Sequence, residues 1–176
     1  MRLSIVLCFI CVAACATTKG DDGGVGSGDP CAENTIVPGG SVEVGTGVPD
    51  GGVFEPIVDG QDLHVQLGSQ GLWMFVLNAR TRDMAVGAGD LEGIVDFALL
   101  DPNGAPMHVQ TGCRVRTFSA LDEYLALATG YALPFSPDFN AQIEGGAVTI
   151  HLELRDHEGH RAVDERHVIA HMPPPN

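Results

Sequence analysis

Two turn-forming sequences, each next to stretches of alternating polar and apolar residues, most constrain the fold of this chain. Asp101-Pro-Asn-Gly104 follows residues 94–100, and Asp156-His-Glu-Gly159 separates residues 148–154 from residues 161–170. Aspartate at the first position and glycine at the fourth favour a type I turn, because glycine takes positive φ without strain. Alternation with a period of two places the apolar side chains on one face of a strand. These patterns predict two β-hairpins within an all-β domain.

Several further stretches have the composition of strands. Residues 72–80 are the most apolar and are predicted to form a central strand, and Asp62–Leu67 alternates so that Leu63, Val65 and Leu67 would share one face. Shorter strands are expected at 41–44 and 54–58. We therefore predict about eight strands over residues 41–171, with the spacing of a β-sandwich.

Residues 121–128 fit two different structures. Asp122 could cap a short helix, whereas residues 124–129 also suit a buried strand that leads into a glycine. We favour the strand. The region from Pro134 to Pro137 is expected to be a loop.

The last hairpin resembles a known group of domains. Its valine-rich strand, its Asp-x-x-Gly turn and its final alternating strand, residues 148–168, are similar to the closing strands of bacterial immunoglobulin-like or PKD-like domains. The resemblance implies an immunoglobulin-like antiparallel β-sandwich of about eight strands. The Cys…Trp…Cys framework of antibody domains is not present, since Trp73 lies far from Cys31 in the sequence. The topology is therefore an analogy, and a fold of this kind does not fix a function.

The N-terminus has the features of an export signal. Arg2 precedes an apolar stretch, residues 3–12, that is too short to cross a bilayer as a helix. Val12-Ala-Ala-Cys15 then resembles the lipobox of bacterial lipoproteins. In that family a diacylglyceryl group is attached to the cysteine thiol and a peptidase cuts just before it. The resemblance implies a signal peptide at 1–14 and a lipidated Cys15, and Ala16, where inner-membrane lipoproteins often carry Asp, favours the outer membrane.

This organisation predicts how the chain is attached to the cell envelope. Residues 15–40, rich in glycine and aspartate, would form a flexible tether, and residues 41–172 would form the β-sandwich domain. Two or three acyl chains hold a protein on a membrane durably, whereas one chain does so only marginally. The alternatives are an ordinary secretory signal cut after Ala16 and an uncleaved membrane helix.

The charge of the chain limits its partners. It has 23 acidic and 9 basic residues, giving a formal net charge of −14 with a single lysine. This excludes nucleic acid, which requires clustered Lys and Arg. It also argues against electrostatic docking on anionic lipids, so the acyl chains would be the membrane contact. An envelope protein or a glycan would be the remaining partner.

The two cysteines of the expected mature domain, Cys31 and Cys113, are predicted to form a disulfide, because an exported protein meets an oxidising compartment. The alternative is two unrelated thiols. Arginines also occur in two pairs, Arg80-x-Arg82 and Arg114-x-Arg116, that point the same way within a strand. These pairs could bind an anionic sugar or a peptide carboxylate, but we favour the neutralisation of nearby acids.

Histidine is concentrated near the C-terminus, where five of the seven occur in the last hairpin. His157 and His160 flank one turn with Glu158 between them, where zinc or copper could find nitrogen ligands. Simple surface exposure is the interpretation that we favour. Because no catalytic signature is present, the sequence predicts a lipid-anchored, non-enzymatic structural or binding module without a cofactor. The alternative function is a periplasmic metal-binding lipoprotein that uses His157 and His160.

Overall fold

The computed structural model describes residues 37–47, 53–87, 92–107 and 113–173. These residues form two sheets that pack against each other, so the predicted all-β sandwich is confirmed. No helix among them is long and apolar enough to cross a membrane. The predicted signal peptide, Cys15, Cys31 and most of the tether lie outside the described residues.

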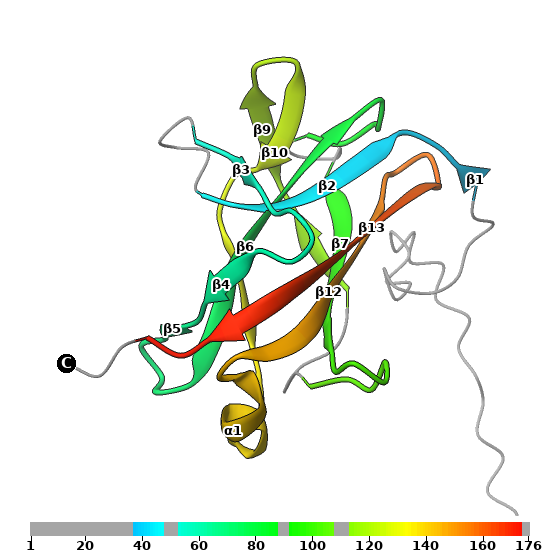
Figure 1. Cartoon of the computed structure of the whole chain (residues 1–176). Helices are drawn as coiled ribbons and strands as arrows, with labels where there is room; N and C mark the ends of the chain where they lie inside the picture. Colours follow the sequence, from blue (N-terminus) through cyan, green and yellow to red (C-terminus); the bar gives the residue numbers. More distant parts are fainter. Residues whose placement is uncertain (1–36, 48–52, 88–91, 108–112, 174–176) are drawn as a thin grey trace, which may run out of the picture.

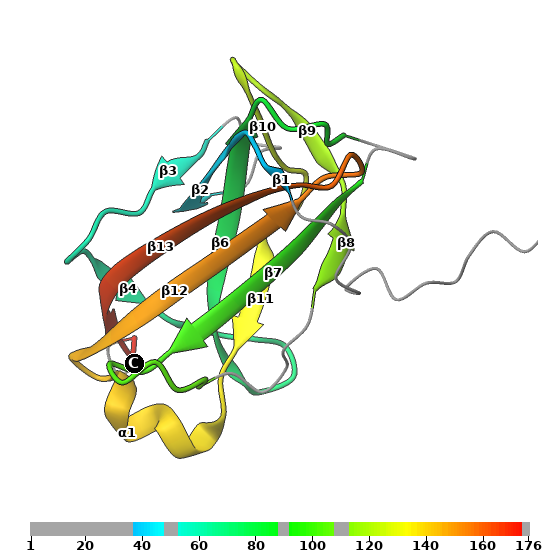
Figure 2. The ribbon, with the colours of Figure 1, turned by 90° about the vertical axis from the view of Figure 1, so that its right-hand side faces the viewer.

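The first sheet is built around the last hairpin. Figure 2 shows β13, β12 and β7 side by side across one face of the molecule. A short strand, β4, pairs in parallel with the end of β13. The strand order is β1 (Val37–Pro38), β13 (His160–His171), β12 (Gly146–Arg155), β7 (Gly93–Leu100) and β8 (Arg114–Arg116), with β4 at Asp62–His64.

The second sheet is built around one long strand, β6 (Trp73–Arg82), as predicted for residues 72–80. The second half of β6 lies between β2 and β10, and its first half lies between β5 and β11. Figure 1 shows β6 crossing the molecule behind β2 and β13. The other strands of this sheet are β2 (Ser41–Thr46), β3 (Glu55–Pro56), β5 (Gln66–Leu67), β9 (Phe118–Leu121), β10 (Tyr124–Leu127) and β11 (Tyr131–Pro134).

The core lies between the two sheets and follows from the alternation of the long strands. Phe75 and Leu77 of β6 are fully buried, and Trp73 packs against the same core. Phe97 of β7 and Leu152 of β12 enter it from the other sheet. Burying a side chain of this size stabilises a fold by roughly 1.5–3 kcal/mol, which is the main force holding the sheets together.

Both predicted turns are confirmed. The N–H of Gly104 donates to the carbonyl of Asp101 at 2.9 Å, and the N–H of Gly159 donates to that of Asp156 at 3.2 Å. Both glycines have positive φ, as such turns require. β12 and β13 pair in register from Gly146 to Arg155. Residues 108–112 of the predicted return strand after Gly104 lie outside the described residues.

The predicted strand 62–67 is wrong as a single element. β4 joins the first sheet, β5 joins the second, and between them the N–H of Val65 donates to the carbonyl of His171. Leu63 and Val65 are buried, as predicted. Leu67 does not share their face, because it belongs to β5 in the other sheet, and it is 60% exposed. The alternation therefore correctly predicts the burial of the first two residues but fails at Leu67, because the chain crosses from one sheet to the other within this stretch.

The strand interpretation of residues 121–128 is confirmed, and the helix alternative is wrong. Asp122 adopts φ +53° in the turn between β9 and β10, a conformation that aspartate tolerates better than most residues. The predicted loop from Pro134 to Pro137 is wrong at both ends. Pro134 ends β11, while Pro137 begins a 3-10 turn, Pro137–Phe139, that continues into α1, Asn140–Ile143. The described residues contain thirteen strand segments rather than about eight, because several edge segments have only two to four residues.

Candidate functional site

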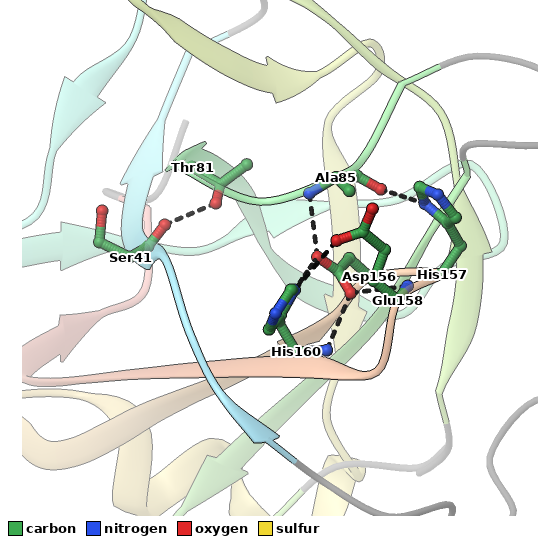
Figure 3. A network of polar contacts seen from close by, with 7 residues as sticks. All are labelled: Ser41, Thr81, Ala85, Asp156, His157, Glu158 and His160. Carbon is green, nitrogen blue, oxygen red and sulfur yellow. Dashed lines mark hydrogen bonds and ion pairs between the residues drawn. The ribbon is translucent and has the colours of Figure 1, made fainter.

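The turn between β12 and β13 is organised by one carboxylate, and Figure 3 shows it pointing toward Ala85 and His160. The side chain of Asp156 has no exposed surface. Its Oδ1 accepts the backbone N–H groups of Glu158 and His160, both at 2.9 Å. Its Oδ2 accepts the N–H of Ala85 at 2.9 Å and lies 3.0 Å from Nδ1 of His160. Burial raises the pKa of Asp156, but these hydrogen bonds, first the one from Ala85, hold it below its ordinary value.

This turn also contains the residues of the predicted alternative, a metal site at His157 and His160. Ligand atoms of Asp156, Glu158 and His160 lie within 4.8 Å of one another. The structure does not bring His157 into this group, because its Nδ1 lies 2.5 Å from the carbonyl oxygen of Ala85. Each oxygen of Asp156 already has two hydrogen-bond partners, which is the usual capacity of a carboxylate oxygen. Metal binding by His157 and His160 stays a prediction, and these contacts argue for a structural corner instead. We call Asp156 and its hydrogen-bond partners Ala85, Glu158 and His160 the Asp156 corner.

The other histidines of the hairpin have separate partners. His151 lies 2.8 Å from Glu165, and His167 lies 2.9 Å from the hydroxyl of Thr149. Both are cross-strand pairs, since the register places these residues directly opposite each other.

His171, at the end of β13, joins this strand to β4 and to the residue that follows α1. Its Nε2 lies 2.9 Å from Asp62, and its Nδ1 lies 3.4 Å from Glu144. The carboxylate of Asp62, followed by that of Glu144, raises the pKa of His171 above its ordinary value.

A second polar region is an open groove of about 260 Å³ where the two sheets meet. It is lined by side chains from four strands, and we call it the arginine groove. Its residues are Ser41, Val42 and Glu43 of β2, Arg80 and Arg82 of β6, Tyr124 of β10 and Arg166 of β13.

The strand period explains how β6 contributes two arginines to this groove. Ala79 and Thr81 are buried, so the alternate residues Arg80 and Arg82 extend from the opposite face of the strand. The register places Glu43 opposite Arg80.

Aromatic rings hold the guanidinium groups of β6. The guanidinium carbon of Arg80 lies 4.1 Å from the ring centre of Tyr124 and 4.6 Å from that of Phe54. That of Arg82 lies 4.5 Å from the ring centre of Tyr124. Contacts of this kind contribute roughly 0.5–2 kcal/mol each. The two guanidinium groups are therefore fixed in position before any ligand arrives.

Carboxylates complete the groove. Arg80 contacts Glu43 through Nε at 2.7 Å and Nη2 at 2.6 Å, and Arg82 forms an ion pair with Glu123. The interpretation that this pair of arginines neutralises nearby acids is confirmed. The Nε of Arg166 donates to Asp164 at 2.9 Å, and Asp164 also accepts the N–H of Val44.

The second arginine pair lies on β8 and has a different neighbour. The guanidinium carbon of Arg116 is 5.4 Å from the ring centre of Tyr131, so this arginine contacts an aromatic ring. Burial raises the pKa of the Tyr131 phenol, although Arg116 and Arg114 oppose that shift. The nearby Cys113 is disulfide-bonded. Because Cys31 lies outside the described residues, the Cys31–Cys113 pairing stays a prediction.

The sequence indicated Arg80 and Arg82 but missed Glu43, Tyr124 and Arg166 as their neighbours. Strand alternation places Glu43 on the outer face, yet only the pairing of β2 and β10 with β6 brings the three strands together. No known protein family matches this sequence, and no curated protein matches it. The function is therefore argued from the groove and from the N-terminal sequence.

Proposed function

We propose that this protein is a lipid-anchored, non-enzymatic binding module of the cell envelope, and that the arginine groove is its binding site. The observation that carries this proposal is the stacking of Arg80 and Arg82 on Tyr124 within an open groove. Arginine remains protonated in proteins and presents a rigid set of donors. Such a site is suited to recognising an anion.

The N-terminal sequence supports the anchor. Val12-Ala-Ala-Cys15 has the small residues and the cysteine of a lipobox. The glycine- and aspartate-rich residues between Cys15 and β1 have the composition of a flexible tether, which is shorter than predicted because Val37 and Pro38 pair with β13. A Cys31–Cys113 disulfide would join the end of this tether to the strand that follows Cys113, β8. The module would then face its partner, an envelope protein or a glycan, from the outer membrane.

The anchor is tested by mass spectrometry of the purified protein and by membrane fractionation. We expect the first residue to be Cys15 carrying acyl chains, and we expect Cys15→Ser to release the protein from the membrane fraction. Cys11→Ser is the matched control, because Cys11 follows Ile10 rather than a small residue. Wild-type protein with an unmodified N-terminus would overturn the proposal.

A further inference from the structure

The two ion pairs of the arginine groove are held unequally. Glu43 is 30% exposed and receives two nitrogen atoms of Arg80. Glu123 is 68% exposed, lies in the β9–β10 turn and contacts Arg82, which is itself 40% exposed. Exposed pairs of this kind contribute at most about 1 kcal/mol, since water competes for both groups. Glu123 is therefore a replaceable partner of Arg82.

Arg82 and Arg166 also have N–H donors that make no hydrogen bond within the described residues. A guanidinium group carries five N–H donors. Arg166 uses its Nε on Asp164, and Arg82 uses one terminal nitrogen on Glu123. Across the described parts of the chain, no further hydrogen bond is made by either guanidinium group. Both groups line the same groove, so one incoming anion can receive donors from two strands that belong to different sheets.

The volume of the groove and the net charge of the chain limit the size and charge of the anion that can bind. A volume of about 260 Å³ holds a small group, below the roughly 300–1,000 Å³ of sites for drug-sized ligands. The net charge of −14 opposes polyanions, because their repulsion grows with each added charge. The half-buried ring of Tyr124 lines the groove beside the arginines, whereas Val42 is buried and offers almost no surface. Two guanidinium groups already stack on that ring, which leaves little aromatic surface for a sugar.

We propose that the arginine groove binds one carboxylate of a peptide, and that this carboxylate replaces Glu123 on Arg82 and also contacts Arg166. This inference rests on the proposed function and specifies its ligand. We infer a carboxylate ligand because the carboxylates of Glu43 and Glu123 already pair with Arg80 and Arg82. Arginine pairs readily with planar carboxylates through two parallel hydrogen bonds.

The test is a titration of the purified full chain in detergent micelles. The probe is N-acetyl-L-leucine, followed by the NMR signals of the arginine side-chain N–H groups. The corresponding amide is the uncharged control, and glucuronate represents a sugar carboxylate. We expect the carboxylate probe to bind at least roughly tenfold more tightly than the amide, a difference of about 1.4 kcal/mol, and more tightly than glucuronate.

Variants separate the ligand role of these residues from a structural role. Glu123→Gln removes the competing carboxylate and is expected to tighten probe binding roughly fivefold, in line with the strength of an exposed ion pair. If Glu123 served only to hold the groove in shape, replacing it would weaken probe binding. Arg82→Gln is expected to abolish binding, with Arg82→Lys as a milder variant and the near-UV signal of Trp73 as the check of folding. Arg116→Gln, from the other arginine pair, is the matched control and should bind as the wild type does.

Each contrary result has a separate meaning. Equal binding of the acid and the amide, or unchanged binding in Glu123→Gln, overturns the carboxylate proposal. Tighter binding of glucuronate overturns the peptide and leaves the groove as a sugar-acid site. Failure of either kind does not affect the lipid on Cys15, which the mass of the N-terminus reports independently.

Discussion

The Asp156 corner and the arginine groove are polar clusters that each include one residue of β13, yet they are built in opposite ways. In the corner, one carboxylate is closed off from water and every acceptor position is filled by the chain itself. In the groove, the cations are fixed by aromatic rings but face partners that are partly exposed. The difference shows that a saturated, buried cluster specifies structure, whereas an open one with replaceable partners is available for binding.

The largest effect is expected from Asp156→Ala, which tests whether the Asp156 corner stabilises the fold. This change leaves the N–H groups of Ala85, Glu158 and His160 without their acceptor. We expect a loss of about 3–5 kcal/mol in the free energy of unfolding, measured by urea denaturation, because each buried N–H group left without an acceptor costs about 1–3 kcal/mol. Asp156→Asn keeps one acceptor oxygen and should cost about 1–3 kcal/mol. A loss below about 1 kcal/mol in the alanine variant would remove the distinction between the two regions.

A smaller effect is expected in the groove from Tyr124→Leu. The leucine keeps apolar volume but removes the ring on which Arg80 and Arg82 stack. We expect about 1 kcal/mol of destabilisation together with weaker binding of the carboxylate probe. Tyr124→Phe is the control, since it retains the ring and should be close to the wild type. A stable Tyr124→Leu variant that binds normally would show that the stack does not prepare the site.

The smallest effect concerns pH and the contact of His171 with Asp62. The folded-state pKa of His171 is raised, so its contribution to stability is fully present below its unfolded pKa and is lost as pH rises through the folded value. We expect Asp62→Asn to lower the pKa of His171 in an NMR titration and to flatten the dependence of stability on pH in that range. His151, which pairs with Glu165 elsewhere on β13, serves as the internal reference. An unchanged His171 titration in Asp62→Asn would contradict this assignment.

Prediction from the sequence worked best where the signal is local. The apolar alternation of residues 72–80 predicted β6 and its buried face, and the Asp-x-x-Gly sequences predicted both turns. It failed where a local pattern continues across a change of sheet, as in residues 62–67. A strand period records which side of the chain is apolar but not which neighbour supplies the next hydrogen bonds.

The candidate site was less predictable than the fold for the same reason. Arg80 and Arg82 were recognised as a pair on one face, and their role in neutralising acids was confirmed. For Tyr124 the sequence indicates only a segment that fits either a helix or a strand, and for Arg166 it contains no local sign of a role. Their proximity depends on how β10 pairs with β6 and on how β13 approaches β2, and neither has a signature within its own segment.

The sequence by itself determined the long strands with their buried faces, the two Asp-x-x-Gly turns and the acidic net charge, and it predicts an anchor at Cys15. Each of these depends on residues that are neighbours in the chain, where backbone geometry fixes the period and turn chemistry fixes the reversal. Only the tertiary structure decided that Asp156 receives the N–H of Ala85 from 71 positions away, and that arginines of both sheets line one groove. Contacts of that range are set by strand register and by the packing of one sheet on the other, which depend on the whole fold at once.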